Sequence, residues 1–119
     1  MKKYLLVSTL AAAALVAPAA AFATTPAEAN AIRSAHEYLH ISGFSHDGLI
    51  NQVHYDGYSR KVSTYAVNHI SVNYRKQAAR SAREYEQISG FSRSGMIQQL
   101  RYDLYTKRQA RHGAHAVGL

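Results

Sequence analysis

The apolar positions of the chain recur at helical spacing over most of its length. In the first such segment Ala31, Ala35 and Tyr38 lie three or four residues apart, which places them on one face of a helix. A second segment carries Leu49 and Val53 with the same periodicity. No segment shows the strict apolar–polar alternation of a half-buried strand. The pattern therefore predicts an all-α fold.

Capping residues predict where these helices begin and end. Thr25-Pro26-Ala27-Glu28 fits a capping box with proline at the first helical position. Further N-cap candidates are Ser45, Ser59, Asn73, Ser92 and Thr106. Gly43 and Gly90 each follow a first helix, and we expect both to end it in the left-handed conformation, with the next phenylalanine folding back. The last helix, after Thr106, has the weakest apolar stripe, and we expect it to fray.

The same unit occurs twice, at an offset of 47 residues. When residues 30–72 are aligned with residues 77–119, 17 of the 43 positions are identical and no gap is needed. Each unit contains three helical segments. We therefore expect two tandem three-helix repeats of the helix-turn-helix type, repeat 1 over residues 24–74 and repeat 2 over residues 75–119.

Residues 1–23 have the features of a secretory signal peptide. Lys2 and Lys3 precede an apolar run over residues 4–17 that is short for a membrane span, and Ala21-Phe22-Ala23 offers a cleavage site. We expect export to the cell surface, the medium or a periplasm, with cleavage after Ala23 and membrane attachment only where this segment stays uncleaved. The chain has no cysteine, which excludes disulfides and the lipobox cysteine of a bacterial lipoprotein.

One stretch has the pattern of a metalloprotease. HEYLHISGFSH, residues 36–46, fits H-E-x-x-H-x-x-G-x-x-H, with His36, His40 and His46 as candidate zinc ligands. Repeat 2 has REYEQISGFSR at the same place, so the three histidines are replaced while the glutamate and the glycine remain. We therefore interpret these histidines as exposed side chains that could bind metal only adventitiously. A small zinc hydrolase is a remote alternative, and we expect neither catalytic residues nor a cofactor.

The net charge of +7 is unevenly distributed. Residues 24–74 carry three basic and four acidic residues, whereas residues 75–119 carry nine and three. The candidate partner-binding residues are the cations Arg93, Arg101, Lys107, Arg108 and Arg111 and the repeated tyrosines Tyr55, Tyr58, Tyr102 and Tyr105. A structural role is the alternative for these tyrosines. Export argues against specific binding of genomic DNA and favours an anionic envelope component or an acidic protein.

The repeated segments resemble a known family. SGFSHDGLINQVHYDGYSRKVSTYAV and SGFSRSGMIQQLRYDLYTKRQARHGAHAVGL are similar to the repeat of Ltp-type host cell surface-exposed lipoproteins, with the pattern S-x-F-S-x-x-G-L-I-x-Q-L-x-Y-x-G-Y-S followed by A-x-x-A-V. The resemblance implies tandem helix-turn-helix-like repeats and offers no catalytic residues. The chain departs from the pattern in lacking the lipobox cysteine and in having Leu104 where repeat 1 has Gly57.

The resemblance also implies a role. Members encoded by temperate phages act in superinfection exclusion and block DNA injection by a second phage, with a tail or injection protein such as the tape-measure protein as the suspected partner. The sequence therefore predicts an exported, non-enzymatic binding protein of this kind. The alternative is an envelope-associated module that binds anionic cell-wall polymer or lipid headgroups and has no phage role.

Overall fold

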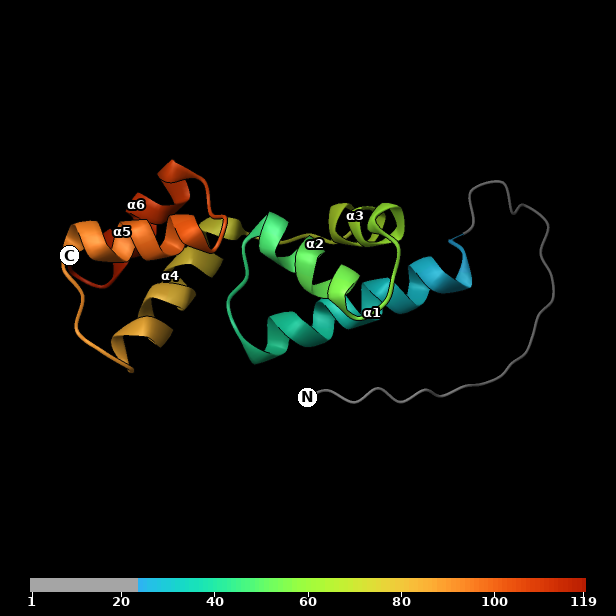
Figure 1. Ribbon diagram of the computed structural model, residues 1–119, viewed down its shortest axis with the longest axis horizontal. Helices are drawn as coiled ribbons and strands as arrows, with labels where there is room; N and C mark the ends of the chain where they lie inside the picture. The colour runs from blue at the N-terminus through green and yellow to red at the C-terminus, as the bar shows by residue number, and fades with distance from the viewer. Residues whose placement is uncertain (1–23) are drawn as a thin grey trace.

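The computed structural model describes residues 24–119, which form six α-helices (Figure 1). The helices are α1 (Pro26–Ile41), α2 (His46–Tyr55), α3 (Arg60–Asn68), α4 (Tyr74–Glu86), α5 (Arg93–Tyr102) and α6 (Lys107–Ala116). Helices α1–α3 belong to repeat 1 and α4–α6 to repeat 2, and no strand occurs among the described residues. The predicted all-α fold of two tandem three-helix repeats is confirmed. The predicted signal peptide lies outside the described residues.

Every one of these helices begins at a residue whose side chain accepts a hydrogen bond from a first-turn N–H. The caps are the predicted ones: Thr25, Ser45, Ser59, Asn73, Ser92 and Thr106. Thr25 and Thr106 complete capping boxes with Glu28 and Gln109. Because each cap contributes about 1 kcal/mol, they matter for helices as short as the nine residues of α3.

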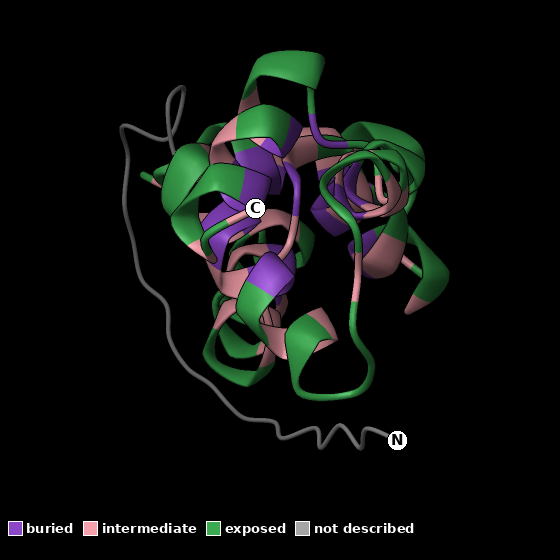
Figure 2. Cartoon of the chain, turned by 90° about the vertical axis from the view of Figure 1, so that its left-hand side faces the viewer, coloured by how far each residue is buried: buried purple, intermediate pink, exposed green. Residues whose placement is uncertain are grey.

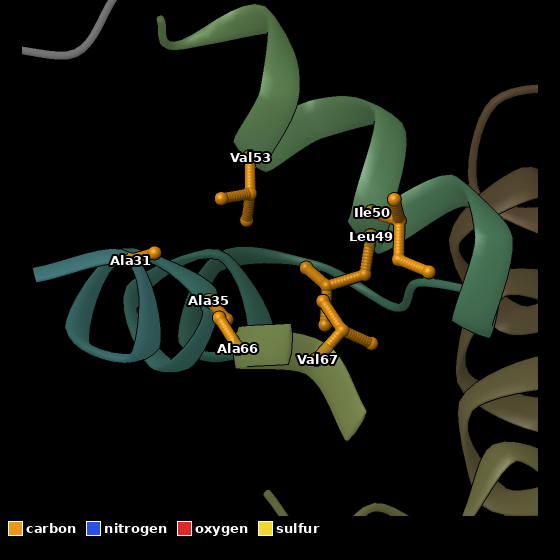
Figure 3. Close-up of a cluster of buried hydrophobic side chains, with 7 residues drawn as sticks. All are labelled: Ala31, Ala35, Leu49, Ile50, Val53, Ala66 and Val67. Carbon is orange, nitrogen blue, oxygen red and sulfur yellow. The ribbon is translucent and has the colours of Figure 1, made fainter. Parts of the chain in front are cut away.

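Each repeat buries its own hydrophobic core. Figure 3 shows the core of repeat 1, formed by Ala31, Ala35, Leu49, Ile50, Val53, Ala66 and Val67. The core of repeat 2 consists of Ala78, Ala82, Met96, Leu100, Tyr105, Ala110 and Ala114. Every pair of described helices in substantial contact lies within one repeat, with α1 on α3 and α4 on α6. The molecule is therefore elongated, measuring 55 × 27 × 19 Å, with two bundles side by side along its length (Figure 1).

The two repeats fix their second helices in the same way. The Phe44 ring packs edge-on against Tyr38, with centroids 5.8 Å apart, and the Tyr38 hydroxyl donates to Asp56 Oδ1 at 2.8 Å. The equivalent residues of repeat 2, Tyr85, Phe91 and Asp103, make the same contacts. The predicted folding-back of both phenylalanines is confirmed. None of the described helices is long and apolar enough to cross a membrane.

The prediction that the last helix frays is wrong. Helix α6 is complete over ten residues and packs against α4 and α5. A Cβ atom on Gly113 would lie 2.7 Å from Leu100 Cδ1 and 2.8 Å from the Ala78 carbonyl oxygen. The glycine that weakens the apolar stripe of α6 is thus what allows α6 and α4 to approach this closely. From the sequence alone Gly113 looks like a helix breaker, because its close contact with α4 depends on the tertiary structure.

The prediction of left-handed glycines after α1 and α4 is also wrong. Among the described residues, the positive φ angles are those of Gly57 (110°), Gly118 (87°) and Leu104 (74°), and neither Gly43 nor Gly90 has one. Helix α1 is instead closed by Ser42, whose backbone is extended, and Gly43 lies in close contact with α4. Gly57 does end α2, as predicted.

Candidate functional site

The three histidines of the metalloprotease-like stretch do not form a metal centre. His36 and His40 are exposed on α1, and His46 is the first residue of α2. The His46 ring is bonded on both sides, with Nδ1 2.7 Å from Asp47 Oδ1 and Nε2 2.6 Å from Asn68 Oδ1. The described residues contain no group of three or more His, Cys, Asp or Glu side chains placed to hold a metal ion. A zinc ligand must present a free nitrogen lone pair, which His46 in this arrangement does not.

The environment of His46 favours its charged form. Burial lowers the pKa of this imidazole, but the hydrogen bonds to Asn68 and Asp47, together with the charge of Asp47, outweigh burial and raise the pKa above its ordinary value. An imidazole that holds its proton more firmly binds metal less readily. His46 therefore acts as a link between the start of α2 and the end of α3.

The predicted basic residues lie on two elements of repeat 2. Lys107, Arg108 and Arg111 are exposed on the first turns of α6, and their spacing of three and four residues places them on one face. Arg101 lies at the end of α5 and donates to the Tyr105 carbonyl oxygen at 2.8 Å, so it also braces the turn that leads into α6. Arg93 begins α5, about 12 Å along the helix axis from Arg101. Four of the five cations thus lie on or beside one helix.

The four candidate tyrosines divide into exposed and packed residues. Tyr55 and Tyr102 are 85% and 82% exposed, whereas Tyr58 packs against the core of repeat 1. Tyr105 is only 1% exposed, which contradicts its assignment to a contact surface. Its hydroxyl pairs with Ser81 Oγ at 2.7 Å inside the protein, and burial raises its pKa. Tyr105 belongs to the core because the turn after α5 directs it back toward α4.

The turn between α1 and α2 contacts repeat 2, which the sequence analysis did not predict. We call residues Ser42–Ser45 the docking turn. The Ser42 hydroxyl donates to Glu84 Oε1 at 2.7 Å, and the Gly43 N–H donates to the same carboxylate at 3.2 and 3.3 Å. A half-buried carboxylate that accepts several hydrogen bonds makes a stronger contact than an exposed surface pair. Glu84 of α4 therefore holds the end of α1.

The rest of the docking turn makes polar contacts with the same repeat. The Phe44 N–H donates to Gln77 Oε1 on α4 at 3.2 Å. The hydroxyl of Ser45, which is buried, donates to the Asp103 carbonyl oxygen and also caps α2 by accepting from the Gly48 N–H. Burial raises the pKa of the Asp103 carboxyl, and hydrogen bonds from Tyr85 and Gln99 partly offset this effect. The turn is thus held at both of its ends.

Arg80 completes the junction from the side of α4. Its guanidinium donates to the carbonyl oxygens of Leu39 and His40, the latter at 3.1 Å, and its Nε lies 3.2 Å from Glu84 Oε2. Carbonyls in the last turn of a helix lack intrahelical partners and carry partial negative charge, so a cation is well placed there. Arg80 caps the C-terminus of α1, and Glu84 binds the residues that follow it.

Gly43 is required by this contact rather than by its backbone conformation. A Cβ atom on Gly43 would lie 2.6 Å from Ser81 Oγ and 2.9 Å from the Gln77 carbonyl oxygen. In contrast, a Cβ atom on the equivalent Gly90 would meet nothing within 4 Å. The signal in the sequence was a stripe on α4 at positions 77, 80, 81 and 84, where polar residues recur at helical spacing. Nothing in the sequence of either repeat alone indicates that this polar stripe of α4 contacts the docking turn of repeat 1.

Two open depressions flank the docking turn. One, of about 300 Å³, is lined by the turn together with Tyr102 and Leu104. The other, of about 550 Å³, is lined in part by Ile41 and Ile88. Ile41, Ile88 and Tyr102 are 69%, 80% and 82% exposed. Exposed apolar side chains beside shaped depressions are typical of contact surfaces, and Tyr102 directly follows Arg101 at the end of α5.

The fold defines an all-α module built from tandem helix-turn-helix-like repeats, with no assembled metal centre in the part of the chain that the structure describes. The sequence model of the host cell surface-exposed lipoprotein (Ltp) family matches residues 27–70 and again residues 73–116. The chain therefore belongs to this family. A comparison with curated proteins found no match.

A solved structure has the same architecture. It is that of Ltp, a superinfection exclusion protein from the Streptococcus thermophilus temperate phage TP-J34. The two chains are 28% identical and superpose with a TM-score of 0.70, over 80% of this chain and 97% of the phage protein. The likeness therefore spans both repeats and not the single unit alone.

Proposed function

We propose that this protein is a non-enzymatic superinfection-exclusion factor that interferes with DNA injection by an infecting phage through protein–protein contact. The observation that carries the proposal is the match in sequence and structure to the exclusion protein of phage TP-J34 over nearly the whole of that chain. The family description as host cell surface-exposed supports an exported location, where an incoming injection apparatus is accessible. The predicted signal peptide supports the same location.

The proposed contact surface consists of Arg101, Tyr102, Lys107, Arg108 and Arg111. Tyr102 offers a large exposed ring of the kind that dominates binding energy at interfaces. Lys107 and Arg108 stand in the first turn of α6, where cations oppose the helix dipole. Their presence there disfavours the helix, so a binding role accounts for them better than stability does. An acidic segment of an injection protein fits this surface.

Exclusion is tested by separating phage adsorption from DNA injection. The full-length gene is expressed in a susceptible host, and bound phage particles and intracellular phage DNA are counted for a panel of phages. We expect normal adsorption and reduced intracellular DNA for at least one phage. Normal DNA injection by every phage tested would refute the proposal.

The contact surface is tested by a matched pair of double substitutions. Lys107→Glu with Arg108→Glu reverses two exposed charges of α6, and Arg60→Glu with Lys61→Glu reverses the equivalent two of α3. We expect the α6 variant to lose exclusion and the α3 variant to keep it, at equal amounts of exported protein. Equal loss in both variants would assign the effect to overall charge rather than to this surface.

The strong positive charge of repeat 2 also supports a second candidate, binding of anionic cell-wall polymer or lipid headgroups. Such binding depends on screened charges and falls steeply with salt. Co-sedimentation of the exported chain with purified cell walls, at about 50 mM and about 500 mM salt, distinguishes the two functions. Salt-sensitive sedimentation without any exclusion phenotype would favour the envelope role.

A further inference from the structure

Each half of the inter-repeat junction occurs a second time in the molecule, where no other described segment docks on it. The turn Ser89–Ser92 is the equivalent of the docking turn and has the same sequence, Ser-Gly-Phe-Ser. We call it the free turn. Three of its four residues are exposed, and nothing approaches the Cβ position of Gly90 within 4 Å. The free turn therefore presents at the end of repeat 2 the surface that the docking turn buries.

The surface that receives the docking turn is duplicated as well. Arg80, Ser81 and Glu84 of α4 correspond to Arg33, Ser34 and Glu37 of α1. Arg33 and Glu37 are exposed, and Arg33 makes a local hydrogen bond with Asn30. The last acceptor for the docking turn is the Asp103 carbonyl oxygen, and it corresponds to the carbonyl oxygen of Asp56. We call the group Arg33, Ser34, Glu37 and Asp56 the free acceptor.

We propose that copies of this protein associate head to tail, with the free turn of one copy docked on the free acceptor of the next, so that the intramolecular junction is repeated between molecules. A contact between two different surfaces of identical chains is heterologous, and it propagates into an open chain unless the rotation closes it. The occupant of both surfaces is thus a second copy of this chain.

The intramolecular junction specifies the contacts between copies. The Ser89 hydroxyl and the Gly90 N–H bind the Glu37 carboxylate, as Ser42 and Gly43 bind Glu84. The Arg33 guanidinium caps carbonyl oxygens at the end of α4, as Arg80 caps those of α1. One position departs from the template, because Asn30 replaces Gln77 and is one methylene shorter. The contact between copies is accordingly weaker than the internal one.

Two details of repeat 2 support a contact surface that is unoccupied in the single molecule. Gly90 has neither a positive φ angle nor a close neighbour in the single molecule, so the fold itself does not require a glycine there. Helix α4 ends at Glu86, whereas the equivalent of the last α1 residue, Ile41, is Ile88. The last turn of α1 is the one whose carbonyls Arg80 binds. At the end of α4, where no guanidinium of a described residue binds the carbonyls, the equivalent of that last turn is not helical.

The charges of the two ends favour this pairing. Residues 24–74 carry a net charge of −1 and residues 75–119 a net charge of +6, so head-to-tail contact brings opposite signs together. Contact between two copies of repeat 2 would instead be repulsive. The turn-on-helix contact is small, so we expect it to be weak and sensitive to salt.

The test measures the mass of the mature chain, residues 24–119, by sedimentation from about 10 µM to about 1 mM at low salt, a range suited to a small interface. We expect the average mass to rise continuously beyond that of a dimer, without a plateau. A mass that stays at the monomer value over the whole range would overturn the proposal. A plateau at the dimer would do so too, because it indicates a two-fold interface.

Two variants block opposite ends. Gly90→Ala places a Cβ where its Gly43 equivalent would lie 2.6 Å from a serine oxygen, and Glu37→Arg removes the carboxylate that receives the turn. Each variant alone should remain monomeric, because each lacks one of the two surfaces. An equimolar mixture should form dimers and nothing larger, since one intact turn and one intact acceptor remain. Growth beyond dimers in the mixture, or normal association of either variant alone, would refute the proposal.

A control variant guards against effects on folding or on charge alone. Arg60→Glu changes one exposed charge of repeat 1 by two units, as Glu37→Arg does but in the opposite direction, and lies outside the free acceptor. We expect it to associate like the unmodified chain. All three variants should keep the helical circular dichroism and the unfolding midpoint of the parent at 10 µM, within about 3 °C. Because this variant makes repeat 1 more negative, markedly stronger association of Arg60→Glu with an intact fold would show that net charge, not the paired surfaces, controls association.

Discussion

At the scale of single residues, Leu104 adopts a strained backbone conformation in a turn that glycine makes without strain. Leu104 has a φ of 74°, and Gly57 at the equivalent position of repeat 1 has 110°. The left-handed conformation costs a branched side chain about 1–2 kcal/mol, partly offset by the extra entropy of glycine in the unfolded chain. We expect Leu104→Gly to stabilise the protein by about 0.5–1 kcal/mol in urea unfolding.

Gly57→Ala provides the reverse test of the same turn. It introduces a side chain at a positive φ angle, and we expect a loss of about 1 kcal/mol. Leu104 is 46% exposed, so its removal gives up little apolar burial. Destabilisation by Leu104→Gly would show that the contacts of this leucine at the edge of the depression outweigh the strain.

The histidines provide a second prediction at this scale. The pKa of His46 is raised by its bonds to Asn68 and Asp47, whereas the pKa of His112 is lowered by burial and by the charge of Arg75. NMR titration should therefore find His46 protonated to a higher pH than His112. Because the folded pKa of His46 exceeds the unfolded one, its stabilising contribution is complete below about pH 6.5 and is lost as the pH rises through the folded value.

His46→Gln should flatten that part of the pH–stability curve. The His46 side chain is 40% exposed, so the effect should remain below about 1 kcal/mol. Measuring the unfolding free energy at about pH 5.5 and about pH 8 for both proteins gives the comparison. An unchanged pH dependence in the variant would contradict the linkage through Asn68 and Asp47.

The exposed histidines of α1 lead to a third prediction, which tests the metalloprotease interpretation. His36→Ala with His40→Ala should leave the fold intact and raise its stability by about 0.5–1 kcal/mol, because alanine is the better helix former. The unfolding midpoint of either protein should not change with zinc or with a chelator. A zinc-dependent midpoint seen only in the unmodified chain would support metal binding by these residues.

At the scale of elements, the sequence predicts what depends on neighbouring residues and misses what depends on distant ones. All six helix starts follow from side chains that bind N–H groups three positions on, so they are readable locally. The roles of Gly43 and Gly113 depend on α4 lying within 3 Å of the position where a Cβ would stand, which no local pattern encodes. Tyr105 was misplaced for the same reason, since Ser81 is its partner across the bundle.

The same limit applies to the candidate site. The basic residues of α6 could be predicted because charge and helical spacing alone define an exposed face. The junction could not be predicted, because the sequence indicates an exposed surface position for Glu84, and its contact with the docking turn appears only in the folded structure. The repeat alignment does not reveal it, because Glu37 and Glu84 are identical in sequence, yet of these two only Glu84 has a hydrogen-bond partner among the described residues.

The junction leads to a fourth prediction, which compares Glu84 with its equivalent in repeat 1, Glu37. Glu84→Ala removes the acceptor of the Ser42 hydroxyl and of the Gly43 N–H, and we expect a loss of about 1–3 kcal/mol. Glu37→Ala removes the same side chain from an exposed position and should change stability by less than about 0.5 kcal/mol. Urea unfolding of both variants at about 10 µM, below the range of association, gives the comparison. Equal losses would contradict the asymmetry of the two repeats.

At the scale of the whole molecule, two separate cores are joined by one polar junction. Figure 2, seen along the length of the molecule, shows buried residues inside the bundles and exposed residues around them. The described residues form no large apolar interface between the repeats, so the coupling depends on the hydrogen bonds of the docking turn, on those of Arg80 to the end of α1 and on the edge-on contact of His46 with Tyr74. This arrangement resembles that of repeat proteins, in which each unit interacts with its neighbours alone.

The coupling of the two cores can be measured by separating them. Fragments of residues 24–72 and 73–119 each retain a complete core, but domains of about 50 residues are marginal in stability. We expect each fragment to be partly helical with a low unfolding midpoint. Mixing them should raise both midpoints, because the docking turn of one fragment binds α4 of the other.

Gly43→Ala in the first fragment should abolish this mutual stabilisation, since its Cβ would clash with Ser81 and with the backbone of Gln77. Gly90→Ala in the second fragment should leave it unchanged and serves as the matched control. Fragments whose midpoints do not respond to mixing would show that chain connectivity, and not the junction, holds the repeats together. In that case we would also expect no measurable binding between the free turn of one copy and the free acceptor of another.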